Sequence, residues 1–307
     1  MDLTVTIGGM KFKNPLWAAS GTFGCGKEFV DFLDLSEVGA IVAKTVTLNP
    51  REGNSTPRVV ETPSGMLNSI GLENKGVEHF AAEVLPEMKR YGTRVIASIS
   101  GFSRQEFVEC ARVLSGKSTP DAIEINLSCP NVRHGHTKCL LMAQDPKATK
   151  EVIRAVKKRA KAPIIAKLTP NVTDIAEIAR AAKDAGADAI SLVNTYFGMA
   201  IDPLTMRPLL GNVVGGLSGP AIRPMAVKAV WEVYKKVKVA IIGIGGIMNG
   251  LDVAEFMIAG ANAVQIGTTN LVEPGAMTRI LREYKEYLKK MKISSARNIV
   301  GRLKTGG

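Results

Sequence analysis

The chain has 307 residues, 46% hydrophobic and 22% charged, a balance typical of a soluble globular protein. Residues 239–247 form the longest nearly unbroken apolar run, which is far too short to span a membrane. The N-terminus resembles no signal peptide, so we expect a cytoplasmic protein that does not bind membranes. The net charge of +12 is spread along the chain without an aromatic-rich basic groove. This argues against nucleic acid and favours an anionic ligand, an acidic partner or a solvated outer face.

Short apolar runs recur along the chain and predict its strands. Residues 1–14 alternate weakly around Gly8-Gly9, which predicts a small N-terminal hairpin. Eight apolar or β-branched runs follow, at residues 16–20, 40–45, 94–100, 122–127, 164–169, 189–194, 240–246 and 263–268. Because these runs are continuously hydrophobic rather than alternating, they indicate a parallel sheet covered by helices.

Amphipathic helical patterns separate most of these strands. They cover residues 76–91, 103–115, 146–161, 173–185, 219–237, 251–259 and 275–291, and a shorter one covers 27–34. Eight strand–helix units in roughly 290 residues match a (β/α)8 TIM barrel, with residues 1–307 as a single domain. A doubly wound open sheet is the alternative, because a strand count cannot show that the sheet closes.

Polar or glycine residues stand at the end of nearly every predicted strand, although the strand bodies are apolar. In chain order they are Ser20, Lys44, Thr45, Ser98, Asn126, Lys167, Asn194, Thr195, Gly245, Gly246, Gly267 and Thr268. Barrel enzymes place their active sites at the carboxyl ends of the strands, so we expect these residues to share one site.

The glycine pairs after the last two strands predict a phosphate site, because glycine lets backbone N–H groups approach an anion. Residues 215–220 open the preceding helix and could add donors. Lys44 and Lys167 stand within apolar strands, where an unpaired charge is costly. Each lysine must therefore meet an anion or extend to solvent at the strand end.

Two further segments carry polar side chains suited to a substrate. Residues 51–75 form a long loop after the second strand, which we expect to cover the site; Asn68 in it is a substrate ligand or an ordinary turn residue. Residues 124–131, Glu-Ile-Asn-Leu-Ser-Cys-Pro-Asn, leave a strand and expose Asn126, Cys129 and Asn131. Cys129 is either reactive or an inert buried thiol.

The motif at 124–131, together with Met-Leu-Asn-Ser-Ile-Gly-Leu at 66–72, Ala-Ser-Gly-Thr-Phe-Gly at 19–24 and Gly-Ile-Gly-Gly at 243–246, resembles class 1 dihydroorotate dehydrogenase. The resemblance runs from about residue 2 to residue 300, with the motifs in the same order. A cysteine at position 129 resembles class 1, since class 2 enzymes carry serine there. The residues Phe23-Gly24 and Met66-Leu67 resemble subclass 1B. The catalytic chain of that subclass works with NAD and with a second subunit that binds an iron–sulfur cluster and FAD.

The resemblance implies FMN on the barrel top and oxidation of dihydroorotate to orotate in de novo pyrimidine (UMP) biosynthesis. The FMN phosphate would lie on Gly219, Gly245, Gly246, Gly267 and Thr268. The other implied cofactor contacts are Ser20, Lys44, Thr45, Ser98 (where the family usually has Asn), Asn126, Lys167 and Val193. The implied substrate contacts are Lys44, Asn68, Ser69, Ile70, Gly71, Leu72, Asn126, Asn131, Asn194 and Thr195. Cys129 would take the C5 proton as general base while C6 delivers hydride to flavin N5.

The residues agree with this chemistry but leave alternatives. A thiolate serves as a base near neutral pH where cations or donors lower its pKa, and a lysine near the flavin stabilises the charge that reduction places there. One alternative is an FMN barrel acting on another dihydropyrimidine. A second is a non-redox phosphate-binding aldolase or isomerase, with Lys167 as a Schiff-base lysine.

The resemblance also implies a homodimeric core joined to an electron-transfer subunit as a heterotetramer. The resemblance places FAD and a [2Fe-2S] cluster on that partner. No iron–sulfur cysteine spacing occurs in this chain, so any such cluster must reside on another chain. We expect no metal site: His134 and His136 have no evident third ligand and indicate a solvated loop. We expect Cys139 to be a packing residue, and we assign no role to Cys25.

Overall fold

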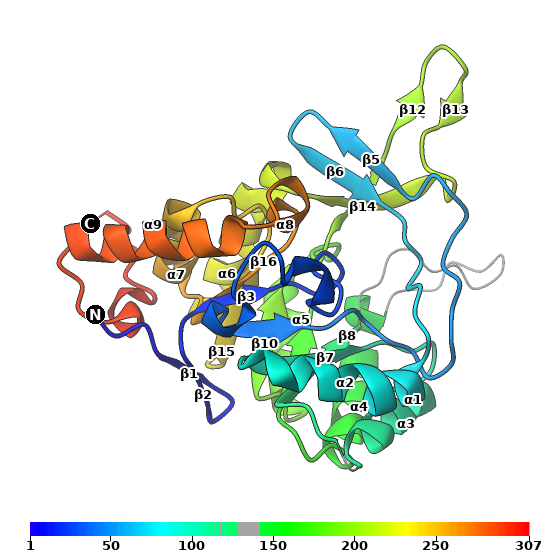
Figure 1. Ribbon diagram of the computed structural model, residues 1–307, viewed down its shortest axis with the longest axis horizontal. Coiled ribbons are helices and arrows are strands. Elements are labelled where there is room, and N and C mark those ends of the chain that lie inside the picture. Colours follow the sequence, from blue (N-terminus) through cyan, green and yellow to red (C-terminus); the bar gives the residue numbers. More distant parts are fainter. Residues whose placement is uncertain (117, 128–141, 307) are drawn as a thin grey trace.

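The computed structural model describes residues 1–116, 118–127 and 142–306. Eight parallel strands close into a barrel, and helices surround it (Figure 1). In barrel order they are β3 (Leu16–Ala18), β4 (Ala40–Val42), β7 (Arg94–Ile99), β8 (Ala122–Asn126), β9 (Ile164–Lys167), β10 (Ala189–Leu192), β15 (Ala240–Ile244) and β16 (Ala263–Ile266), which pairs with β3. The predicted (β/α)8 barrel is confirmed, and closure removes the open-sheet alternative. Each strand ends one to three residues earlier than expected.

The helices on the outside follow the predicted patterns. They are α1 (Val77–His79), α2 (Leu85–Met88), α3 (Arg104–Leu114), α4 (Pro146–Lys157), α5 (Ile175–Asp184), α6 (Arg223–Lys236), α7 (Gly250–Ala259), α8 (Thr269–Val272) and α9 (Ala276–Lys290). A π-helical turn at Phe80–Val84 joins α1 to α2, so the segment expected at 76–91 is one helical stretch with irregular turns. Side-chain caps define several starts; the Asp174 side chain, for example, accepts hydrogen bonds from the first-turn amides of α5.

The short helix predicted at 27–34 is wrong. Only a 3₁₀ turn at Lys27–Phe29 forms there, and a second such turn follows at Leu35–Glu37. The Asp34 side chain accepts a hydrogen bond from the Ser36 amide and so begins the second turn instead of extending the first. Eight residues are too few to sustain a helix against such a competing cap.

The predicted N-terminal hairpin closes the bottom of the barrel. β1 (Val5–Ile7) pairs with β2 (Met10–Phe12) through the two-residue turn Gly8-Gly9, in which both glycines have positive φ. Val5, Ile7 and Phe12 are buried in one cluster with Trp17 and the lowest inward-facing residues of the barrel strands. The Phe12 and Trp17 rings lie 4.4 Å apart. This apolar layer seals the amino-terminal end, so the opposite end alone is left to hold a site.

A second, antiparallel sheet stands beside the carboxyl ends of the barrel strands and projects from the molecule (Figure 1). Its strands are β11 (Tyr196–Met199), β14 (Val214–Ser218), β6 (Gly65–Asn68) and β5 (Val59–Thr62), with β12 (Ile201–Asp202) and β13 (Arg207–Pro208) as a separate pair. The segment expected as a loop at 51–75 therefore contains a hairpin. Residues 214–218 form a strand and not the start of a helix, which begins at Arg223 after a 3₁₀ turn. The prediction that residues 215–220 open a helix is therefore wrong. Gly215 and Gly216 instead allow close packing of β14 against strand β6 and Thr195.

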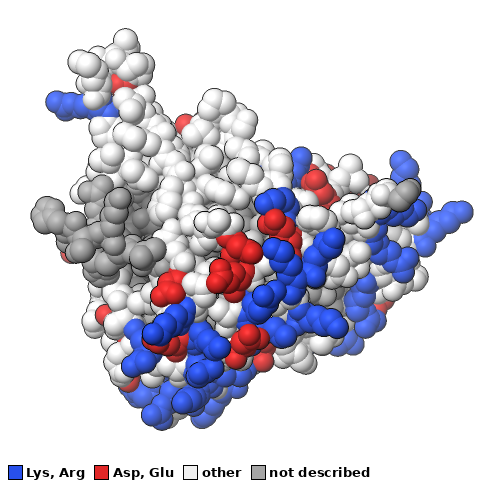
Figure 2. Space-filling model, turned by 180° about the vertical axis from the view of Figure 1, so that it is seen from behind, with Lys and Arg blue, Asp and Glu red and all other residues white. Residues whose placement is uncertain are grey.

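The charge distribution follows the helices. Figure 2 shows Lys and Arg gathered over the lower part of one face, with fewer charges on the projecting end. Exposed basic residues include Lys147 and Arg154 on α4 and Lys289 and Lys290 at the end of α9. Such positions suit a solvated outer face, and the absence of nucleic-acid binding stays a prediction. Among the helices of the described residues, none has the length and apolar character needed to cross a membrane.

Candidate active site

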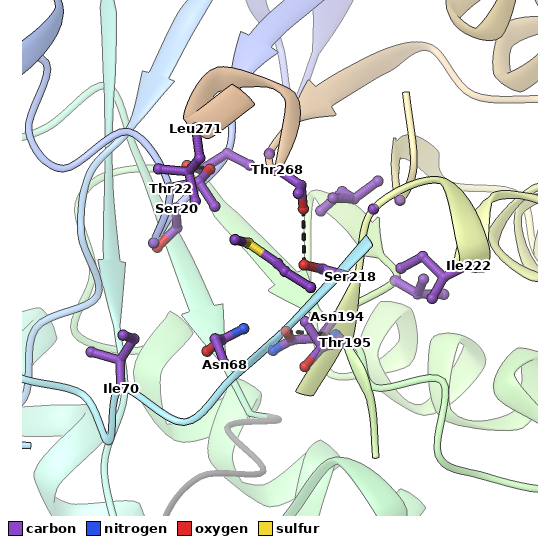
Figure 3. A pocket seen from close by; sticks show the side chains of 18 of the residues that line it. Ser20, Thr22, Asn68, Ile70, Asn194, Thr195, Ser218, Ile222, Thr268 and Leu271 are labelled. Carbon is purple, nitrogen blue, oxygen red and sulfur yellow. Dashed lines mark hydrogen bonds between the residues drawn. The ribbon is translucent and has the colours of Figure 1, made fainter. Parts of the chain in front are cut away.

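A pocket opens at the carboxyl ends of the barrel strands, between the barrel and the second sheet (Figure 3). Most of the predicted site residues line it: Ser20, Lys44, Thr45, Asn68, Ile70, Gly71, Leu72, Asn126, Lys167, Val193, Asn194, Thr195, Gly219, Gly245, Gly246, Gly267 and Thr268. Parallel strands bring their ends together at one edge, which is why residues far apart in sequence meet here. The roles assigned to these residues stay predictions.

Hydrogen bonds link the polar strand ends across the pocket floor. The Thr45 hydroxyl lies 3.0 Å from Ser20 Oγ, and Asn126 Nδ2 donates to Thr45 Oγ1 at 3.3 Å. Asn194 Nδ2 donates in turn to Asn126 Oδ1 at 3.3 Å. These bonds fix the orientation of two carboxamides, which leaves further donor and acceptor positions of defined direction for a ligand.

Ser98 lies one layer below this floor. Its side chain is fully buried, and its Oγ is 2.9 Å from Thr45 Oγ1. Ser98 is not among the residues that line the pocket. A direct contact between Ser98 and a cofactor stays a prediction, and its present contact supports the position of Thr45.

Lys44 and Lys167 are the only charged side chains among the described residues that line the pocket. Lys167 is almost completely buried, and its ammonium lies 3.7 Å from the carboxylate of the fully buried Glu124. Lys167 therefore meets an anion and does not extend to bulk solvent. Two cations in a confined, largely apolar pocket attract an anionic ligand strongly.

The glycine turns after β14, β15 and β16 line one side of the pocket. Gly246 has φ 72°, and a Cβ on it would lie 2.7 Å from Arg223 Cβ, so this turn requires glycine. Gly267 differs, because its φ is ordinary and a Cβ there would have no heavy atom of the described residues nearer than 3.7 Å. A Cβ on Gly267 would contact Ala19 and Thr22, which also line the pocket. Glycine leaves the backbone at this point accessible to an anion, and the phosphate contact of Gly267 stays a prediction.

The second sheet supplies the opposite wall. Asn68 at the end of β6 donates from Nδ2 to the Gly216 carbonyl at 3.4 Å and faces the pocket near Asn194 and Thr195 (Figure 3). Ser69, one residue later, is fully buried and is not among the lining residues. Alternation along the strand explains this, since adjacent side chains point to opposite faces.

Several lining residues were missed in the sequence. They are Ala19, Gly21, Thr22, Val59, Met66, Ser218, Ile222, Ile244, Ile247, Thr269 and Leu271. Most are apolar, as is usual for the lining of a ligand pocket. Thr268 and Ser218 are joined by a hydrogen bond of 2.8 Å, drawn in Figure 3. Apolar residues next to strand ends look like core in a sequence, so no signal separated them.

Five candidates lie outside the described residues: Cys129, Asn131, His134, His136 and Cys139. The structure therefore does not test the base role predicted for Cys129 or the substrate contact predicted for Asn131. It also does not test the interpretation of Cys139 as a packing residue or of His134 and His136 as part of a solvated loop. Among the described residues, no group of three or more His, Cys, Asp or Glu side chains is arranged to hold a metal ion.

The two cysteines within the described residues are poor bases at neutral pH. Burial raises the pKa of the Cys25 thiol to about 11 and that of the Cys110 thiol to about 12. Both side chains pack against the hydrophobic core. Neither thiol is thus suited to the proton abstraction predicted for a cysteine in this chain.

Comparison with known proteins gives a consistent result. The family model described as dihydroorotate dehydrogenase matches residues 2–288. A Citrifermentans bemidjiense protein named dihydroorotate dehydrogenase B (NAD(+)), catalytic subunit, is 51% identical over 302 residues, which cover 98% of both chains. Proteins of the same name are 52% identical in Caldicellulosiruptor saccharolyticus, over 99% of both chains, and 46% identical in Bacteroides thetaiotaomicron, over 98% of this chain and 99% of that protein.

Proposed function

The chain belongs to the dihydroorotate dehydrogenase family, and on that premise we propose that it oxidises dihydroorotate to orotate with FMN in pyrimidine biosynthesis. As a member of this family it is an oxidoreductase, and its relatives are dihydroorotate dehydrogenases of subclass 1B. Family membership excludes the alternative that the chain is a non-redox aldolase or isomerase. The observation that carries the proposal is the pocket at the barrel top. It combines glycine turns, two ammonium groups and fixed carboxamides within a single space.

The residues of the pocket fit FMN in their chemistry. The backbone at Gly267, which no side chain of its own covers, and the glycine turn at Gly245-Gly246 suit a phosphate, with Gly219 and Thr268 lining the same pocket. Apolar side chains such as Met66 and Ile244 supply surfaces for a flat ring. When bound, FMN would supply the hydride acceptor that the oxidation of dihydroorotate requires.

The chain's own residues orient the substrate and move its proton. We propose that Asn68, Asn126 and Asn194 bind the ring amides and carbonyl oxygens, because a fixed carboxamide both donates and accepts. Lys44 lines the same pocket and supplies positive charge for the substrate carboxylate. We propose that Asn131 and the segment from Ser69 to Leu72 complete this set.

We propose that Cys129 is the general base that removes the C5 proton. In the sequence Cys129 stands three residues after Asn126, the last residue of strand β8, which lines the pocket. The raised pKa values of Cys25 and Cys110 make those two thiols unsuitable. The C5 proton would pass to the sulfur, the electron pair of the C5–H bond would form the C5=C6 double bond, and the C6 hydrogen would leave as hydride with its own electron pair.

We further propose that the electrons reach NAD through a partner subunit that carries FAD and a [2Fe-2S] cluster, in a heterotetramer built on a homodimer. The name of the relatives contains both NAD(+) and catalytic subunit, and this name implies a second subunit in those proteins. Co-purification from cells, with flavin and iron analysis of any bound chain, tests this part separately.

Anaerobic mixing of the purified protein with dihydroorotate tests the central reaction. We expect FMN to be released on denaturation, and the flavin absorbance of the native protein to bleach as one orotate forms per flavin. A yellow protein that does not bleach would retain the flavin barrel and point to another dihydropyrimidine. A colourless protein that gains no activity with added FMN would refute the flavin assignment.

A further inference from the structure

The middle of the barrel contains a buried polar layer that the proposed reaction does not explain. Glu124 on β8 is fully buried, and its Oε2 accepts hydrogen bonds from Ser191 Oγ at 2.9 Å and Gln265 Nε2 at 2.8 Å. Its Oε1 accepts no hydrogen bond from the described residues but lies 3.7 Å from Lys167 Nζ. Four strands of the barrel, β8, β9, β10 and β16, thus converge on one carboxylate.

Stability does not account for this layer. The interior of such barrels is usually filled by branched aliphatic side chains, and the layer below Glu124 follows that rule with residues such as Ile165 and Ile242. Replacing a buried ion pair by apolar residues of similar volume is often neutral or stabilising. A buried charged pair that reaches a ligand pocket through Lys167 points to a role in that pocket.

The position of the pair relative to the pocket defines the role. Lys167 lines the pocket whereas Glu124 does not, so the ammonium lies between the carboxylate and any ligand. Among the described residues, Lys44 is the other charged group that lines the pocket. A ligand in the pocket therefore experiences the positive charge of Lys167 partly offset by the carboxylate below it.

We propose that Glu124 is a positioning residue that anchors Lys167 and lowers the reduction potential of a flavin bound above it. The inference rests on the proposed flavin function. Reduction adds negative charge to the flavin, and Lys167 stabilises that charge. The carboxylate of Glu124 opposes this stabilisation through the low-dielectric interior and holds the ammonium in a fixed place. Glu124 touches neither flavin nor substrate in this role.

The test measures the flavin midpoint potential by equilibration with a reference dye, which requires no turnover. Glu124→Gln keeps the shape of the side chain and removes its charge. We expect the ratio of reduced to oxidised flavin at a fixed potential to rise at least tenfold, equivalent to about 30 mV for a two-electron couple. Lys167→Met should shift the ratio in the opposite direction, and the double variant should return near the wild-type value.

Ser191→Ala is the matched control, because it removes one hydrogen bond from the same carboxylate without changing its charge. Its midpoint potential should stay near that of the wild type. If Glu124→Gln does not fold, the difference between Lys167→Met and the double variant measures the same carboxylate. An unchanged or lowered potential on removal of the Glu124 charge would overturn the role of Glu124 alone. A protein that carries no flavin and gains no activity with added FMN would instead refute the proposed function, before any variant is compared.

Discussion

Gly267 offers a substitution with opposite expected effects on stability and on cofactor binding. A Cβ at this position would meet Ala19 Cβ and Thr22 Oγ1 at 3.7 Å, an ordinary van der Waals distance, and the backbone φ does not require glycine. Gly267→Ala should therefore leave the fold intact and stabilise it by about 0.4–1 kcal/mol through the unfolded chain. The added methyl group occupies the space proposed for the phosphate. Loss of one charge-assisted hydrogen bond there costs about 1.5–3 kcal/mol, or about 10- to 150-fold in the dissociation constant of FMN.

Two measurements separate these effects. Urea unfolding of the apoprotein gives the change in stability, and titration of apoprotein with FMN gives the change in affinity. Gly246→Ala is the contrasting variant, because its positive φ and the 2.7 Å approach to Arg223 Cβ predict losses in both measurements. Gly267→Ala protein that unfolds at lower urea concentration would contradict the packing argument. Gly267→Ala protein that binds FMN as tightly as the wild type would show that the phosphate does not lie against Gly267.

Three further predictions concern the base, the barrel plug and a buried thiol. The plug is the apolar layer of the N-terminal hairpin, which seals the amino-terminal end of the barrel. Cys129→Ala should slow anaerobic flavin reduction by dihydroorotate by about 10²- to 10⁴-fold with unchanged flavin content, and a smaller change would remove Cys129 as the base. Phe12→Ala should lower the free energy of unfolding by about 3–5 kcal/mol in urea titrations without altering the flavin spectrum, because the plug lies at the far end of the barrel from the pocket. The raised pKa of Cys25, about 11, leaves its thiol protonated at neutral pH, so its alkylation by iodoacetamide should be slow at pH 7 and rise about tenfold per pH unit toward pH 10. Peptide mapping by mass spectrometry checks this, and rapid labelling of Cys25 at pH 7 would contradict the burial argument.

The barrel and much of its pocket could be predicted from the sequence because both depend on local signals. Continuous apolar runs mark buried parallel strands, and the residue after each run must lie at the common edge of the sheet. Lys167 and Asn126 were therefore assigned to one site although they come from different strands. The same reasoning placed Ser98 in the site, whereas the structure shows it one layer lower, with its hydroxyl on Thr45. Strand period alone does not say at which level of the barrel an inward side chain lies.

The second sheet and the polar layer depend on pairings that no local pattern reveals. Strand β14 contains two adjacent glycines, which look like a turn in sequence, yet it pairs with β6 from the early part of the chain. Its pairing is decided by close approach to Thr195 and Asn68 and not by β propensity. Glu124 accepts hydrogen bonds from Ser191 and Gln265, which lie 67 and 141 residues away from it in the sequence. A glutamate within an apolar strand shows that something must compensate its charge, but not which residues do so.

A crystal structure of the protein with FMN and orotate would test the central claim most directly, since that claim concerns where the two molecules bind. We predict FMN in the pocket at the barrel top, with its phosphate on the backbone of Gly245, Gly246 and Gly267 and with orotate held against Asn68 and Asn194. The structure would also place Cys129 relative to C5 of the pyrimidine. Flavin bound at any other surface, or orotate beyond reach of these carboxamides, would contradict the account.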